Sequence, residues 1–340
     1  MSTAEWAGVL KETTTEWWND KAPRLGASLA YYTILSLAPL LVLVTPVVGW
    51  IFGRERARTQ IMNQVSQLLG TEAGVAVDAL IGVTGIAQPS PLATTLTAGV
   101  LLFAASGVFA ELQDAMDTIW EVTPKVGSRA ALLSLLRQRF LSFAMVLGIG
   151  FLLLVSLLIS AMLSTLQQYA SEHVRIAAAV WTAAHGLVSF LITTLLFAMI
   201  FKVLPDVKMR WRDVWLGAAL TSALFVLGRY LIGKYIGQAA LWKTYGQGAK
   251  SLVALLVWVY YSAQILIFGA EFTKTYTKRI GAGATPTEVA VPVTEEARAE
   301  QGITKPEVVE AVAEVVERKR QEETGAEGQR AAETDRVDTP

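Results

Sequence analysis

Cysteine is absent from this chain of 340 residues, and there are only two histidines. Without cysteine there can be no disulfide, no thiolate nucleophile and no cysteine-ligated metal. His173 and His185 lack the additional acidic ligands that a metal site would need. The sequence also contains no HExxH motif, no phosphate-binding glycine loop and no nucleophile elbow. We therefore expect no catalytic residue, no bound metal and no cofactor, and we predict that the protein is not an enzyme.

Charged residues are scarce as well, at 17% of the chain against 53% hydrophobic residues. Three long stretches carry no charge at all, namely Leu25 to Gly53, Phe140 to Ser171 and Ile176 to Phe201. A bilayer core about 30 Å thick requires roughly 20 helical residues to cross it. Because backbone groups in hydrocarbon must hydrogen-bond to one another, segments of this length are expected to be helices. The sequence predicts an all-α, polytopic membrane protein.

We predict a bundle of six transmembrane helices within a membrane domain that covers residues 25–279, preceded by an interfacial segment over residues 1–24. The fifth helix has the weakest signal, because Arg229 and Lys234 interrupt it. The predicted spans are 25–52, 92–112, 140–166, 176–201, 213–237 and 251–272.

The distribution of positive charge predicts the orientation of these helices. Cytoplasmic loops of membrane proteins carry an excess of Lys and Arg. If both termini are cytoplasmic, the inner segments hold 14 Lys and Arg residues and the outer segments hold 6. We therefore predict that both termini are cytoplasmic.

Two regions outside the predicted spans have their own character. Apolar residues recur at helical spacing within residues 54–88, which predicts either an amphipathic helix on the outer surface or a helical hairpin packed on the bundle.

The C-terminal segment from Gly281 to Pro340 holds 7 Lys and Arg against 14 Asp and Glu. We expect residues 280–340 to form an acidic, mostly disordered cytoplasmic tail.

Polar residues near or within the spans are the candidate functional residues, because a charge in hydrocarbon is costly. Glu111, Asp114 and Asp117 are spaced three apart and form an acidic strip at the inner end of the second span. This strip could be a cation or proton site, or a gate that pairs with Arg137 and Arg139. The alternative interpretation is a solvated helix end.

Arg229 and Lys234 lie in the outer half of the fifth span. At about 1.5 Å per residue from Asp213, Arg229 is roughly 24 Å along the helix and does not reach the far surface. It is a candidate contact for an anionic lipid phosphate or a substrate carboxylate. Lys234 is a second candidate for the same contact, although both side chains could instead extend to the outer surface.

A polar stripe on the sixth span contains Tyr261, Gln264 and Glu271 at helical spacing. Such a stripe either joins helices by hydrogen bonds or lines a water-filled path. In the second case we expect Glu271 to meet substrate, or Arg210 and Arg212, at the inner mouth.

Further candidates line the same interior. Tyr31 and Tyr32 in the first span and His185 in the fourth could face a cavity. Pro39 and Pro46 remove backbone hydrogen bonds and are predicted to bend the first helix. Broken helices of this kind occur at the binding sites of some transporters and also in bundles without a site.

Five segments resemble the YihY/BrkB family of bacterial inner-membrane proteins. They are RLGASLAYYTILSLAPLL from Arg24, LFAASGVFAELQDAMDTIW from Leu102, RQRFLSFAMVLGIGFLLLVSL from Arg137, LPDVKMRWRDVWLGA from Leu204 and WVYYSAQILIFGAEF from Trp258. The resemblance covers residues 22–277 and implies six spans, cytoplasmic termini and location in the bacterial cytoplasmic membrane. Many family members are labelled ribonuclease BN, a label that this sequence does not support because it lacks the metal ligands.

Three functions agree with these residues. The protein could be a transporter or flippase-like exporter of an anionic lipid or solute, with Arg229 as the anion contact. It could be a cation- or proton-coupled transporter that uses Glu111, Asp114 and Glu271. It could also be a non-transporting scaffold that recruits envelope machinery. We predict transport, with membrane lipids and an anionic lipid or small solute as partners and no nucleic acid. The sequence does not indicate an oligomeric state.

Overall fold

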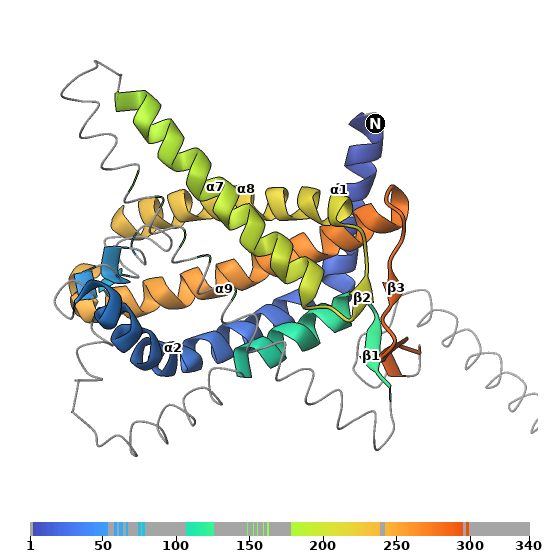
Figure 1. Cartoon of the computed structure of the whole chain (residues 1–340), viewed down its shortest axis with the longest axis horizontal. Helices are drawn as coiled ribbons and strands as arrows, with labels where there is room; N and C mark the ends of the chain where they lie inside the picture. The colour runs from blue at the N-terminus through green and yellow to red at the C-terminus, as the bar shows by residue number, and fades with distance from the viewer. Residues whose placement is uncertain are drawn as a thin grey trace, which may run out of the picture. The chain divides into compact units, whose positions relative to one another are not determined.

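The protein is described by a computed structural model that covers residues 3–53, 107–125, 178–238 and 242–294, together with short helical stretches or single positions within 58–78, 148–162 and 297–298. Residues 1–292 form one compact unit, which holds the elements discussed below. The described part of the chain is predominantly helical, as the sequence predicts (Figure 1).

The chain begins with two helices joined by a sharp turn. Helix α1 spans Thr3–Asn19 and helix α2 spans Ala22–Phe52. Lys21 at the joint has φ 52° and ψ 39°, a left-handed conformation that costs a residue with a side chain about 1–2 kcal/mol. Pro23 follows in the first turn of α2, where a missing N–H is harmless.

Three further long helices make the centre of the unit. They are α7 (Ala178–Val203), α8 (Trp211–Gln238) and α9 (Trp242–Arg279). Helix α9 runs between α8 and α2 and packs on both, while its C-terminal end also contacts α1 (Figure 1). The apolar stretch of α9 is 56% buried within the protein, against 28% for those of α7 and α8. Helix α9 is therefore the central element of the described bundle.

Three described helices are long and apolar enough to cross a membrane, over Ala183–Val203, Trp211–Ile232 and Val253–Arg279. They correspond to the predicted fourth, fifth and sixth spans. The predicted first span lies within α2, and residues 107–112 of the predicted second span are helical. The rest of the second span and most of the third lie outside the described residues, so the number of six stays a prediction.

Glycines allow α8 and α9 to approach closely. A Cβ atom added to Gly217 would lie 1.9 Å from the Thr273 hydroxyl, and one added to Gly269 would lie 1.9 Å from the Thr221 hydroxyl. The two contacts are reciprocal, because each helix contributes a glycine that accommodates a threonine of the other. Small residues at such crossings are a common feature of helix packing in membranes.

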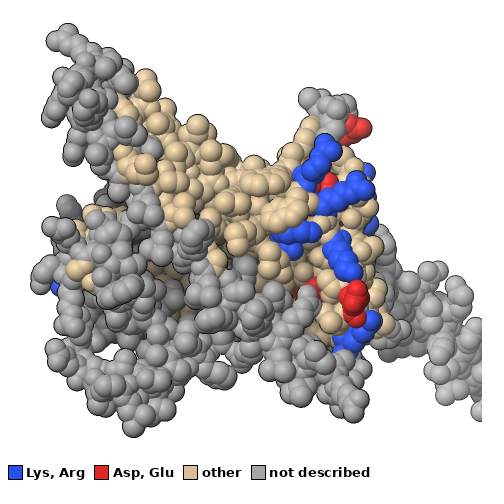
Figure 2. Space-filling model, viewed as in Figure 1, with Lys and Arg blue, Asp and Glu red and all other residues tan. Residues whose placement is uncertain are grey.

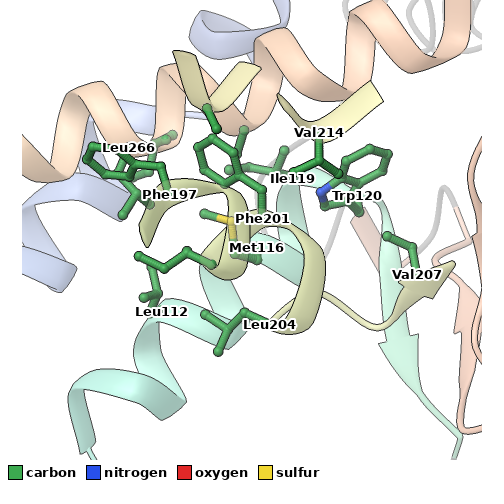
Figure 3. Close-up of a cluster of buried hydrophobic side chains, with 14 of the residues drawn as sticks. Leu112, Met116, Ile119, Trp120, Phe197, Phe201, Leu204, Val207, Val214 and Leu266 are labelled. Carbon is green, nitrogen blue, oxygen red and sulfur yellow. The ribbon is translucent and has the colours of Figure 1, made fainter. Parts of the chain in front are cut away.

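A cluster of buried apolar side chains lies beside this crossing (Figure 3). It combines the helical segment 107–119, the end of α7, the start of α8 and the second half of α9. Close packing among these segments, which are distant in sequence, holds the neighbouring ends of several helices together. The labelled members are Leu112, Met116, Ile119, Trp120, Phe197, Phe201, Leu204, Val207, Val214 and Leu266.

Four short strands join loops at the same end of the bundle. Strand β1 (Val122–Pro124) pairs antiparallel with β4 (Ala290–Pro292), and β2 (Val207–Lys208) pairs antiparallel with β3 (Thr285–Pro286). The segment that follows α9 thus bonds to the loop after the helical segment 107–119 and to the α7–α8 loop.

These strands correct one predicted boundary. We predicted a mostly disordered tail from residue 280, but residues 285–292 form β3 and β4. The physical reason is that two loop edges offer unpaired backbone groups, and the chain leaving α9 satisfies them. The tail beyond residue 298 lies outside the described residues.

The described positions between residues 58 and 78 favour the helical hairpin over a single surface helix. Arg58 Nε lies 2.6 Å from Asp78 Oδ1, and a Cβ on Gly74 would lie 2.1 Å from the Ser66 hydroxyl. Two helical stretches therefore pack against each other, with Ile61 buried. The hydrogen bond from Arg58 lowers the pKa of the Asp78 carboxyl below its ordinary value.

The glycine crossing generates a stability prediction. Gly269→Ala should lower the free energy of unfolding by about 1–3 kcal/mol, because the new methyl group overlaps Thr221 and approaches buried Phe201 at 3.0 Å. Gly186→Ala on α7 is the matched control, since its Cβ would meet no atom within 4 Å. The control should leave stability unchanged or raise it by about 0.5–1 kcal/mol. Unfolding in detergent micelles measures the stability of both variants. Equal changes in the free energy of unfolding for Gly269→Ala and Gly186→Ala would contradict the close packing at Gly269.

Candidate functional site

Charged side chains gather at one end of the molecule. In Figure 2 the visible Lys, Arg, Asp and Glu residues lie mainly over the end at which α1, β2 and β3 are found, while most of the remaining described surface is uncharged. This is the end predicted to face the cytoplasm. Within it, a group of ionisable side chains lies below the surface.

Lys274 on α9 is the centre of this group, which we call the Lys274 cluster. Its ammonium nitrogen lies 3.1 Å from the Glu121 carboxylate, 3.4 Å from Asp20, 3.8 Å from Glu16 and 3.8 Å from Glu271. The four acids come from α1, the α1–α2 joint, the turn before β1 and α9 itself. One lysine thus connects three segments that lie far apart in sequence.

Burial differs among the four acids. The side chains of Asp20 and Glu271 are fully buried, whereas those of Glu16 and Glu121 are 27% and 30% exposed. Neither carboxyl oxygen of Glu271 has a hydrogen-bond donor among the described residues. A buried charge without hydrogen bonds is costly, so Glu271 is the most unusual member of the cluster.

Two further contacts attach helix α1 to α9. Trp6 stacks on Phe272 and Tyr276, with ring centroids 6.4 Å and 6.2 Å apart. Arg279 forms an ion pair with Glu12. Helix α1 is therefore a covering helix that brings carboxylates to the inner end of α9.

Two residues with side chains adopt a left-handed backbone conformation among the described residues, and both belong to this region. Lys21, with φ 52°, follows buried Asp20 directly. Glu121, with φ 54°, is itself a neighbour of Lys274. Such conformations cost about 1–3 kcal/mol each and tend to occur at functional sites, where surrounding contacts maintain them.

The predicted acidic strip does not act as one unit. Glu111 accepts a hydrogen bond from the Ser28 hydroxyl of α2, and Asp114 is exposed. Asp117 is buried and accepts a hydrogen bond of 2.7 Å from the backbone N–H of Asp206. Asp117 thus connects the helical segment 107–119 to the α7–α8 loop, and a cation or proton site at Glu111 and Asp114 stays a prediction. Arg137 and Arg139, the proposed gate partners, lie outside the described residues.

The residues of the polar stripe on α9 also lie in different environments. Tyr261 donates a hydrogen bond of 3.0 Å to the Leu224 carbonyl of α8, and the Gln264 amide lies 3.3 Å from the Pro23 carbonyl of α2. Both side chains therefore join helices. Glu271 lies beside Lys274, and within the described part of the chain it forms no ion pair with Arg210 or Arg212, the partners that we expected at the inner mouth.

The remaining candidates lie away from the cluster. Tyr31 and Tyr32 are exposed on α2 and contact each other edge to face, and His185 is partly buried on α7. Helix α2 continues through Pro39 and Pro46, whose side chains are not described, and its second half bends in Figure 1.

The two candidate anion contacts differ from each other. Lys234 is exposed near the end of α8, beside the exposed residues Tyr230 and Leu231. Arg229 is partly buried and has an interaction within the chain. The assignment of Arg229 and Lys234 as anion contacts therefore stays a prediction.

Sequence reasoning selected Glu271 but missed Lys274, Asp20, Glu16 and Glu121. Part of the signal was local, because Lys274 follows Glu271 by three residues and Asp20 follows Glu16 by four, so each pair shares a helix face. The convergence of the two pairs was not visible, since it requires α1 to fold back on α9. Among the described residues, no group of three or more potential ligands is arranged to hold a metal ion.

Removal of the central lysine tests the cluster. Lys274→Met should lower stability by about 3 kcal/mol, because it leaves buried carboxylates without their shared cation. Adding Glu271→Gln should restore part of the loss, since one stranded charge disappears. Lys278→Met, an exposed position on the same helix, is the control and should change stability by less than about 0.5 kcal/mol. Unfolding in detergent measures all three, and equal effects of the two lysine variants would contradict the arrangement.

Comparison with known proteins adds to this geometry. The family model described as Virulence factor BrkB matches residues 13–293, which include every residue of the Lys274 cluster and the four strands. The match therefore extends beyond residues 22–277 at both ends. No solved structure matches the chain.

Individual relatives agree with the family. A UPF0761 membrane protein of Tolumonas auensis is 27% identical over 76% of this chain and 82% of its own length. A UPF0761 membrane protein of Psychrobacter is 23% identical over 80% of this chain, which spans only about half (49%) of that relative. YfkH of Bacillus subtilis, named a ribonuclease-like protein, is 24% identical over 79% of this chain and 95% of its own length. With membrane-spanning helices in the structure, these matches show that the chain is an integral membrane protein and belongs to the Virulence factor BrkB family.

Proposed function

We propose that this protein is a transporter whose cargo movement is coupled to protons. The observation that carries the proposal is the Lys274 cluster, in which two fully buried carboxyl groups lie at the inner end of the central helix. Ionisable residues at such positions in membrane proteins commonly belong to ion or proton pathways.

The arrangement of these acids supports a proton-coupled transporter. Glu16 and Glu121 are partly exposed and lie around the same ammonium group as buried Asp20 and Glu271. Protons could pass from water to the exposed pair and on to the buried pair. A non-transporting scaffold would have no need of fully buried carboxyl groups.

For the cargo, we propose an anionic lipid or small anionic solute. The support comes from Lys234, which is exposed on α8 among exposed apolar and aromatic side chains. Such a surface suits an amphiphile with a negative head group. We further propose six spans with both termini cytoplasmic, location in the bacterial cytoplasmic membrane, and no catalytic activity or nucleic-acid binding.

The test uses the full chain in vesicles of phosphatidylethanolamine and phosphatidylglycerol that enclose a pH-sensitive dye. An imposed potential, negative inside, should drive protons inward through the wild-type protein. Glu271→Gln should reduce this flux to the rate of protein-free vesicles, because the amide cannot carry a proton between carboxyl groups. Glu288→Gln, an exposed carboxylate outside the cluster, should retain it.

A parallel assay follows a fluorescent anionic phospholipid and a neutral one in the same vesicles. Movement of the anionic lipid that changes with the pH gradient would support the proposed cargo. Wild-type vesicles that pass neither protons nor lipid would contradict the function, as would a proton flux equal in Glu271→Gln and the wild type.

A further inference from the structure

The Lys274 cluster joins a peripheral element to a central one. Helix α9 is packed on several helices, whereas α1 is attached to the bundle chiefly through α9 and through a short joint. Asp20, the last acid before that joint, is fully buried against the end of α9. The protonation state of the buried acids therefore affects whether α1 remains packed against α9.

Asp20 and Glu271 occupy one buried site, because both are fully buried and lie 3.4 Å and 3.8 Å from the same Lys274 ammonium nitrogen. Carboxylates are acceptors only, so a contact between two carboxyl groups becomes a hydrogen bond when one of them carries a proton. This explains how Glu271 can lack any other donor while fully buried. Two ionised carboxylates in the same dry site would repel each other, and one ammonium group at 3.4 Å and 3.8 Å is already shared with Glu16 and Glu121.

From this shared buried site we propose that Asp20 and Glu271 share one proton, and that loss of this proton releases α1 from the C-terminal end of α9. The inference deepens the proposed function, because it names the proton-binding residues and the element that moves. A proton fits the site better than a metal ion, since the Lys274 ammonium already occupies the space among the oxygens.

The charges around Asp20 and Glu271 explain why loss of the proton, and not its gain, releases α1. The groups that face the pair are Glu16 on α1, Glu121 on the turn before β1 and Lys274 on α9, and Glu12 and Arg279 form a further ion pair between α1 and α9. When the shared proton leaves, Asp20 and Glu271 both become negative in a buried site. Their repulsion acts on the joint at Lys21, which is already in a left-handed conformation and relaxes when α1 swings away.

Electron paramagnetic resonance can measure this movement, because the chain has no cysteine and spin labels attach only where cysteine is introduced. Labels at Ala7→Cys on α1 and Ala223→Cys on α8 occupy exposed positions on the two elements. For the full chain in lipid nanodiscs, double electron–electron resonance should show one narrow distance in acidic buffer. In alkaline buffer the distribution should shift and broaden.

Variants of the two acids test whether the shared proton causes the movement. Glu271→Gln imitates the protonated acid and should keep the narrow distance at every pH, and Asp20→Asn should do the same. Glu288→Gln should behave as the wild type. A distribution that is independent of pH in the wild type, a response retained in both cluster variants, or a response to sodium at constant pH would overturn the inference.

The two proposals fail separately. If the labelled helix responds to pH as described but reconstituted vesicles pass neither protons nor lipid, the shared proton stands and the transport function falls. If vesicles transport protons while α1 stays fixed, the function stands and the movement of α1 is excluded.

Discussion

The attraction between Lys274 and the acidic side chains of Glu16, Asp20, Glu121 and Glu271 is the interaction on which the charged end of this protein depends. It brings together α1, the turn before β1 and the end of α9, which lie far apart in sequence. Buried ion pairs seldom add much net stability, because desolvation offsets attraction, but losing one partner is strongly destabilising. The Lys274 cluster thus determines how α1, the turn before β1 and the end of α9 pack together. It also makes this packing sensitive to the charge of the clustered acids.

The rest of the described bundle is held together by apolar side chains and close helix packing. Reciprocal glycine contacts at Gly217 and Gly269 let α8 and α9 meet closely, and the apolar cluster around Met116 and Phe201 fills the space beside them. Such packing resists gradual deformation. A rigid apolar frame with a charged, strained inner end is a combination in which a small change of charge can move one peripheral helix and leave the frame intact.

The sequence predicted the class of fold well and the site only in part. Hydropathy located α2, α7, α8 and α9 to within a few residues at most ends, because the bilayer imposes length and composition on each helix separately. Glu271 was selected since charge within a span is rare. The partners of Glu271 and the strands β3 and β4 were missed, because both arise from contacts between distant segments, which leave no periodic pattern in a single sequence.

The presence of a protonated carboxyl group in the Lys274 cluster is the central claim, and infrared spectroscopy tests it most directly. A difference spectrum between the wild-type protein and Glu271→Gln in neutral buffer isolates the absorption of this one side chain. The account predicts a carbonyl band of a protonated carboxylic acid that is present in the wild type and absent from the variant. A difference spectrum that contains only the bands of an ionised carboxylate would contradict it.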